Sequence, residues 1–184
     1  VVNLGWKLAG VVNGWGGNNL LKSYHAERHK NSIRNTEFAK RFADSIGGYK
    51  AVSELEDDTA KGRKARKEAG IYLEAHARAE FNIPGITFGY RYDGSPIIIK
   101  DDAALPPDGP NEYTPTASPG GRAPHAWLRD GRSLYDEFGF EFTLMCLSPA
   151  VNIAHVKRMV LEKGLPIIFV KVFEKSVRNL YEAD

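Results

Sequence analysis

The side chains that could carry chemistry in this sequence are few, and none stands in a complete catalytic arrangement. Cys146, the one cysteine, is the obvious redox candidate. Dithiol redox chemistry needs a thiolate at a helix N-terminus and a second cysteine three residues further on. Here the chain continues as Ser148-Pro149-Ala150-Val151, without a second thiol. We therefore interpret Cys146 as a buried structural thiol.

A metal site is the second candidate, because two histidines lie four residues apart. His25 and His29 share a helix face, but Glu27 between them lies off that face, and no third ligand follows nearby. We interpret the histidines as exposed side chains of a helix. The sequence predicts no metal ligand and no catalytic residue, since it shows no Ser-His-Asp order, nucleophile elbow or carboxylate pair.

Arg122, His125 and Trp127 form the third candidate, a site for an anion or an aromatic ligand. The alternative is a buried turn, in which the arginine and the histidine bond backbone carbonyl groups and the tryptophan fills the core. We favour the buried turn, so these residues are expected to be structural.

A basic stretch provides the last candidate, a phosphate-binding patch made of Lys61, Arg63, Lys64, Arg66 and Lys67. No aromatic residue alternates with these charges, as stacking on bases would require. A solvated loop and helix start is the preferred interpretation. The formal net charge of +2 is also too small to indicate nucleic acid or an anionic membrane as a partner.

Composition places the chain among globular proteins, with 42% hydrophobic and 26% charged residues. The longest apolar run, Leu165 to Val170, is far below the roughly 20 residues that a membrane-spanning helix needs. A single cysteine fits a reducing compartment, and we expect the cytoplasm. The chain begins with Val1 rather than Met, and we expect it to be part of something longer.

Helices should position the first half of the chain. A helix with one apolar face is predicted at the N-terminus, and the glycines after residue 13 end it. Asn3 and Lys7 lie opposite that face. The apolar face consists of Val1, Leu4, Leu8, Val11, Val12 and Trp15. Asn18 or Asn19 can cap a second helix, with a possible break near Asn31 and an end at Gly47. Another helix is expected from residue 65 to the Pro84-Gly85 stop.

Strands should dominate the second half. Alternation over residues 86–92, the Asp93-Gly94 turn and residues 96–99 predict a hairpin, and residues 100–121 form a Pro-rich linker. A second hairpin is expected around Asp130-Gly131. A strand at 140–146, a helix capped by Ser148 or Asn152, and an apolar strand at 165–172 then predict a βαβ unit.

Three blocks resemble the flavin-dependent aromatic hydroxylases, the phenol hydroxylase-like branch in particular. They are NLGWKLAGVVNGW with LLKSYHAER (residues 3–28), FGYRY with Ser95-Pro96 (residues 88–96), and PGGRAPHAWL with DG and SLYD (residues 119–136). The last block and the strand after it resemble the thioredoxin-like C-terminal domain of that family. The resemblance covers most of the chain.

The resemblance implies a larger flavoprotein that uses NADPH and O₂ to hydroxylate a phenolic or other aromatic substrate. Its FAD-binding motifs are absent from this sequence, because Gly14, Gly16 and Gly17 follow a helix rather than a strand. We therefore expect FAD and NADPH as cofactors of the parent enzyme, and neither for this chain alone. Expected partners are the missing N-terminal FAD and substrate domains and further copies of the enzyme.

The fold class that follows is α/β: a helical segment (1–84), a strand hairpin with a Pro-rich linker (85–121) and a thioredoxin-like domain (122–184), expected to be incomplete at both ends. Structural or interdomain roles are assigned to Trp6, Tyr24, Glu27, Arg28, Arg122, His125 and Trp127. Glu27 and Arg28 are expected to tie their helix to the flavin domain by packing and ion pairing. The alternative function is a stand-alone, non-catalytic interaction module with a thioredoxin-like fold.

Overall fold

A computed structural model describes residues 1–183, which contain six α-helices, two short 3₁₀ helices and two strands. In chain order they are α1 (Val2–Val12), α2 (Asn19–Gly47), η1 (Ser53–Glu56), α3 (Ala60–Phe81), α4 (Pro84–Phe88), η2 (Leu134–Glu137), β1 (Phe142–Cys146), α5 (Ala154–Glu162), β2 (Ile167–Lys171) and α6 (Lys175–Tyr181). The coarse prediction of a mixed α/β chain is confirmed. Among these residues, no helix combines the length and the apolar character needed to cross a membrane.

The residues group into two compact units that interleave along the chain. The first unit contains Val1–Arg28, Arg91–Pro106 and the residues from Pro115 onward, and the second contains His29–Tyr90 and Pro107–Thr114. Helix α2 runs through the boundary at residue 28 without interruption, so the predicted break near Asn31 is wrong. Asn31 is itself buried within the continuous helix.

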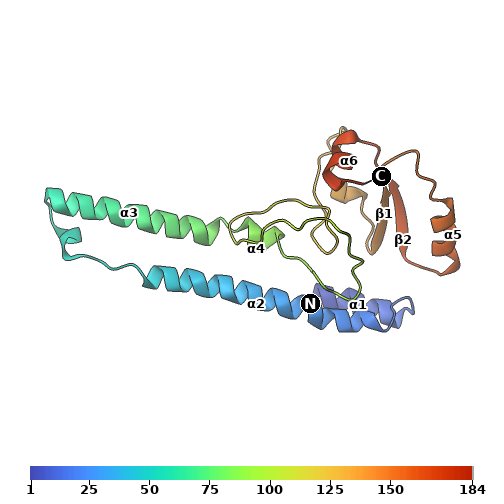
Figure 1. Cartoon of the computed structure of the whole chain (residues 1–184), viewed down its shortest axis with the longest axis horizontal. Coiled ribbons are helices and arrows are strands. Elements are labelled where there is room, and N and C mark those ends of the chain that lie inside the picture. The colour runs from blue at the N-terminus through green and yellow to red at the C-terminus, as the bar shows by residue number, and fades with distance from the viewer. Residues whose placement is uncertain (184) are drawn as a thin grey trace. The chain divides into compact units, whose positions relative to one another are not determined.

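In the first unit, β1 and β2 lie side by side with α5 next to them (Figure 1). The two strands are parallel, with Phe142 opposite Ile167 and Cys146 opposite Lys171. The predicted strand–helix–strand order is confirmed. Gly164, at φ +60°, ends the turn after α5, and Asn152 Oδ1 accepts a hydrogen bond of 2.9 Å from the amide of Ala154 at the start of α5.

A small apolar core holds this α/β part together. It is built from Leu128, Leu134, Leu147, Val172 and Val177. The predicted turn at Asp130-Gly131 is confirmed, since Leu128 N–H bonds the carbonyl of Arg132 at 2.9 Å and Gly131 has φ +85°. The apolar run of β2 is typical of a buried parallel strand, but Ile168 is 44% exposed.

The hairpin predicted over residues 86–99 is half wrong. Its turn exists, because Gly94 has φ +80° and Ser95 N–H bonds the carbonyl of Tyr92 at 2.9 Å. Its strands do not form: the first begins instead as helix α4, with Pro84 in the first turn. The alternating pattern predicted a strand wrongly. Pro84 fixes its φ angle at a value that suits the first turn of a helix, and the chain continues as α4.

The second unit is held by close contacts around Gly85. Arg34 donates hydrogen bonds to the carbonyl of Gly85 (2.9 Å) and to Asp108 (Nε to Oδ2, 2.8 Å). The amide of Gly85 in turn donates to the carbonyl of Pro110 at 3.1 Å. A Cβ atom at Gly85 would overlap the carbonyl oxygen of Gly109, so only glycine fits where this loop crosses α4.

We predict that Gly85→Ala lowers the free energy of unfolding by about 1–3 kcal/mol or more, because the backbone of the 107–114 loop must move away. Gly70→Ala is the matched control: it lies in the interior of α3 with no atom within 4 Å of the added Cβ. That change should stabilise by up to about 1 kcal/mol through helix propensity. Urea unfolding followed by circular dichroism measures both, and equal effects of the two changes would contradict the close approach at Gly85.

Candidate functional site

A buried ion pair joins α1 and α2. Lys7 Nζ lies 2.5 Å from Glu27 Oε2, and the two side chains are 0% and 1% exposed. Lys7 also donates to the hydroxyl of Ser23, which donates to the carbonyl of Leu20 at 2.6 Å. Two charges removed from water are tolerated only where such partners surround them.

A loop and the start of α1 complete the arrangement around Glu27. Ser95 Oγ donates to Glu27 Oε1 at 2.7 Å, and Asn3 Nδ2 donates to Glu27 Oε2 at 3.1 Å. Asn3 Nδ2 also lies 3.2 Å from the hydroxyl of Tyr92. We call Asn3, Lys7, Ser23, Glu27 and Ser95 the Lys7–Glu27 cluster; it joins three segments that are far apart in the sequence.

The environment of Glu27 holds the pKa of its carboxyl below the ordinary value of 4.5. Burial alone raises this pKa, but the hydrogen bonds from Lys7, Ser95 and Asn3 and the charge of Lys7 outweigh burial. The carboxylate is therefore ionised and fully engaged. Because both charges are buried and paired with each other, the cluster holds backbone segments of α1, α2 and the Ser95 loop in place.

The cluster reverses the predicted orientation of α1. Lys7 and Gly10 are the buried residues of this helix, whereas most of the predicted apolar face is exposed, with Leu8 at 45% and Val12 at 83%; Leu4 and Trp15 are half-buried. Lys7, which the sequence places opposite the apolar residues, therefore lies on the buried side of α1. Its burial is explained by Glu27, whose position 20 residues further on gave no spacing signal in the sequence.

Trp6 lies beside the cluster and packs on aromatic rings. Its indole stacks on that of Trp15 with ring centroids 6.3 Å apart and an interplanar angle of 7°. Both indoles meet the ring of Phe142 edge-on, at 6.0 and 5.4 Å. Such offset and perpendicular arrangements are those that aromatic rings prefer. Trp6 thus links α1 to the start of β1.

Two further assigned residues lie on α2. Tyr24 is half-buried and Arg28 is exposed. Glu27 pairs with Lys7 of α1 within this chain, so the ion pair expected between the Glu27-Arg28 dipeptide and the flavin domain stays a prediction. The proposed interdomain roles of Tyr24 and Arg28 stay predictions.

The remaining assigned residues meet around Tyr135 at the surface. The guanidinium of Arg122 lies 5.2 Å from the Tyr135 ring centroid, and His125 contacts Tyr135 and Trp127 edge-on at 5.0 Å each. His125 Nε2 is 2.9 Å from Ser133 Oγ. Arg122 and His125 are exposed and Trp127 is 71% exposed, so the expectation of a buried turn with Trp127 in the core was wrong. Leu128 and Leu134, which flank the turn, fill the core instead.

The thiol, the basic stretch and the metal site are the remaining candidates from the sequence. Cys146 is buried and donates from Sγ to the carbonyl of Ser148 at 3.2 Å, which confirms the structural thiol. In the basic stretch, Arg66 donates to the carbonyls of Leu55 and Asp57 at 2.7 and 2.9 Å. Within residues 1–183, no three His, Cys, Asp or Glu side chains are grouped so as to hold a metal ion.

The glycines after α1 do not form a dinucleotide site. Gly16 lies so close to α1 that an added Cβ would come within 2.8 Å of the Gly10 carbonyl carbon and 2.6 Å of Leu20 Cδ2. These glycines let the chain fold back from α1 into α2, rather than present a helix after a strand to a pyrophosphate. These glycines therefore do not make the strand–turn–helix arrangement that holds a pyrophosphate.

Comparison with known proteins gives one family match and many relatives. The model of the FAD binding domain matches residues 1–39. The chain is 33% identical over 150 residues to the FAD-dependent monooxygenase opdD of Penicillium oxalicum, covering 79% of this chain and 28% of the relative. It is 28% identical over 201 residues to phenol 2-monooxygenase of Pseudomonas sp., covering 90% and 33%.

Among solved structures, the rebeccamycin biosynthetic enzyme RebC with reduced flavin matches with a TM-score of 0.85 and 34% identity, over 98% of this chain and 34% of that one. This chain is related to FAD-dependent monooxygenases. The predicted resemblance is confirmed, and FAD is the cofactor named for the relatives. NADPH stays a prediction. The chain spans about a third of the length of these relatives, from 28% to 34%.

We predict that Lys7→Met lowers the free energy of unfolding by about 3–5 kcal/mol, because it leaves the Glu27 carboxylate buried without its cation. Lys40→Met is the control, since Lys40 and Asp44 form an exposed ion pair at 2.7 Å whose loss should cost less than about 1 kcal/mol. The double change Lys7→Met with Glu27→Met removes both charges and should recover much of the loss. Urea unfolding measures the free energy of unfolding of Lys7→Met, Lys40→Met and the double variant. Equal values for Lys7→Met and Lys40→Met would contradict the buried ion pair.

The lowered pKa of Glu27 predicts a loss of stability in acid. Below pH 4.5 the unfolded chain takes up a proton at this carboxyl before the folded chain does, so stability falls as pH drops towards the folded pKa. The variant with both Lys7→Met and Glu27→Met has no carboxyl group at position 27. Its free energy of unfolding should therefore fall less steeply than that of the unchanged protein between about pH 5 and pH 3. Identical pH slopes of the two proteins in that range would show that Glu27 is not held ionised.

Proposed function

We propose that this chain is the C-terminal part of a FAD- and NADPH-dependent monooxygenase that hydroxylates a phenolic or related aromatic substrate. In this proposal the chain supports the reaction and contributes no catalytic side chain. One observation carries it: the match to the FAD binding domain, residues 1–39, coincides with the two helices that the Lys7–Glu27 cluster locks together. The cluster would thereby hold one edge of the flavin domain.

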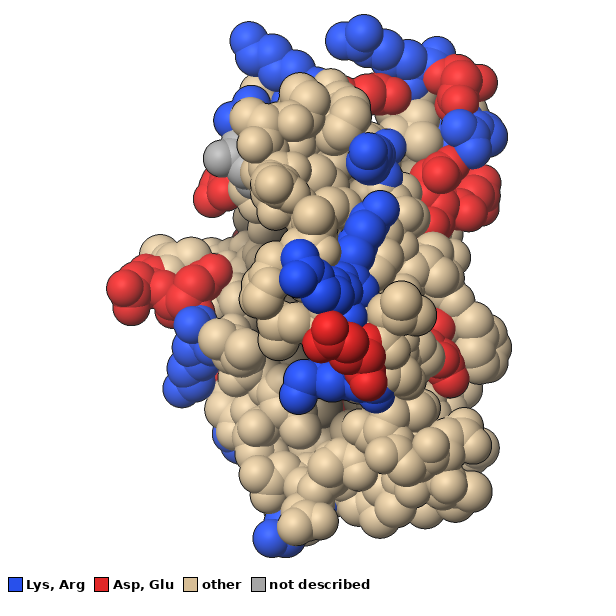
Figure 2. Space-filling model, turned by 90° about the vertical axis from the view of Figure 1, so that its right-hand side faces the viewer, with Lys and Arg blue, Asp and Glu red and all other residues tan. Residues whose placement is uncertain are grey.

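The exposed face of α1 supports a larger assembly. Val1, Val2, Leu8, Val11 and Val12 are all at least 40% exposed. Figure 2 shows a broad area largely free of charged side chains in its lower part, over α1 and the turn after it. Apolar areas of this kind are usually covered by another protein surface. We assign the cover to the remaining FAD and substrate domains, because residues 1–39 match the model of that domain.

The substrate class rests on the relatives. Phenol is named for the relative from Pseudomonas, which matches 90% of this chain. A phenolic ring is electron-rich, which suits attack by oxygen that a reduced flavin has activated, with NADPH as the reductant. The substrate would be bound outside this chain, since no described catalytic group is available here for the ring.

The C-terminal part is proposed to be a thioredoxin-like domain with a structural role. The parallel pair β1 and β2, connected through α5 and followed by α6, supports this proposal. The buried Cys146 without a second cysteine supports a scaffold rather than a redox device. The division into segments 1–84, 85–121 and 122–184 is part of the same proposal, as are self-association and a cytoplasmic location.

A stand-alone interaction module is the second candidate function. The surface group of Arg122, His125, Trp127 and Tyr135 favours it, because an indole that is 71% exposed beside cationic and aromatic groups is a common feature of contact surfaces. In this alternative, the chain would bind another protein and no flavin.

The longest gene product that contains this chain decides between the two. We expect it to purify with the absorption spectrum of bound flavin and to consume NADPH faster when phenol is added, whereas residues 1–184 alone remain colourless after mixing with FAD and desalting. Lys7→Met in the long product should lower its flavin content, and Lys40→Met should not. A colourless long product that stays inactive with added FAD and a panel of phenols would overturn the proposal.

A further inference from the structure

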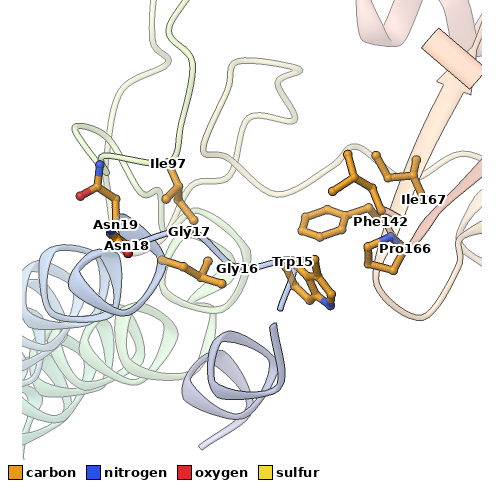
Figure 3. A pocket seen from close by; sticks show the side chains of 11 residues that line it. Trp15, Gly16, Gly17, Asn18, Asn19, Ile97, Phe142, Pro166 and Ile167 are labelled. Carbon is orange, nitrogen blue, oxygen red and sulfur yellow. The ribbon is translucent and has the colours of Figure 1, made fainter. Parts of the chain in front are cut away.

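An apolar pocket lies within the first unit, next to the turn between α1 and α2. Its volume is about 430 Å³, within the range of roughly 300–1,000 Å³ typical of small-molecule sites. Figure 3 shows Trp15 and Phe142 on one side and Ile97 and Asn19 on the other. The lining residues are Trp15, Gly16, Gly17, Asn18, Asn19, Leu20, Ile97, Phe142, Leu165, Pro166 and Ile167.

The aromatic wall of this pocket is fixed before any ligand arrives. Trp15 stacks on Trp6 and meets Phe142 edge-on, so its indole is held from two directions. It also lies directly over Gly10, where an added Cβ would come within 2.6 Å of the ring. The amides of Trp15 and Gly16 both bond the carbonyl of Gly10, at 3.1 and 2.8 Å. A pre-formed wall reduces the ordering cost of binding.

The chemistry of the lining selects the ligand. None of the eleven lining residues is Lys, Arg, Asp, Glu or His, so a charged group inside would lose its hydration without compensation. Rings and aliphatic side chains form most of the wall, and the amides of Asn18 and Asn19 offer donors and acceptors at one end. At Gly17 no atom lies within 4 Å of the place where a Cβ would stand, which leaves room for a flat molecule.

We propose that this pocket binds an uncharged, planar aromatic compound of roughly two or three fused rings, with its hydroxyl or carbonyl group towards Asn18 and Asn19 and its rings against Trp15 and Phe142. The proposal concerns residues of this chain alone. It therefore does not depend on the flavin reaction, and binding can be measured without FAD.

The test is calorimetric titration of the full chain, residues 1–184, with 2-naphthol, which is uncharged at pH 7. We expect saturable binding with one site per chain. 2-Naphthoate, which has the same rings and a carboxylate in place of the hydroxyl, should bind about tenfold more weakly or not at all, because its charge must be desolvated. Equal binding of the two compounds, or no saturable binding of 2-naphthol, would overturn the proposal.

Variants locate the site. Ile97→Trp fills the pocket from the loop and should weaken 2-naphthol binding by about tenfold or more. Ile99→Trp is the matched control, because Ile99 is 89% exposed on the same loop and does not line the pocket. Gly17→Leu is a second filling variant, with no atom within 4 Å of the added Cβ. Circular dichroism checks that each variant folds; unchanged binding in a folded filling variant would place the naphthol elsewhere and refute the assignment.

Discussion

The contact between Lys7 and Glu27 determines how the N-terminal helices are packed. An ammonium and a carboxylate with almost no exposure can be accommodated only if every remaining donor and acceptor is also supplied. Ser23, Asn3 and Ser95 supply partners to the two charges, whereas the buried Oδ1 atom of Asn3 itself accepts no hydrogen bond within the described residues. As a result, α1 turns its polar side inwards, and the loop that carries Ser95 must return to the helix pair. The apolar side of α1 is left for a further surface.

The sequence predicted the elements that depend on local backbone signals better than those that depend on distant contacts. Local signals worked where the backbone itself decides: the turns at Gly94 and Gly131, the end of α2 at Gly47, and the order of β1, α5 and β2. They failed at α1, because hydrophobic periodicity assumes that the apolar face points to the core of the same chain. They also failed at residues 86–92, where proline geometry overrode an alternating pattern.

The candidate site was predictable only in part, for a similar reason. Glu27 and Trp6 were selected through resemblance, and both lie at the centre of dense contacts. Lys7, Ser23 and Ser95 were missed, because partners 16 to 68 residues apart leave no periodic trace. Trp127 was placed in the core by its size, whereas the turn directs it outwards and leaves the interior to Leu128 and Leu134. The pocket beside Trp15 combines four separate segments and has no signature in sequence.

The interleaving of the two units has a consequence for the order in which the chain can fold. The backbone passes between the units after residues 28, 90, 106 and 114, so neither unit is a continuous stretch. During synthesis, Glu27 emerges 68 residues before Ser95, and β1 much later still. Contacts this distant in sequence close slowly, since the intervening chain must be confined first. The Lys7–Glu27 pair can therefore reach its final enclosure only after the loop that carries Ser95 has been made and has returned to the helix pair.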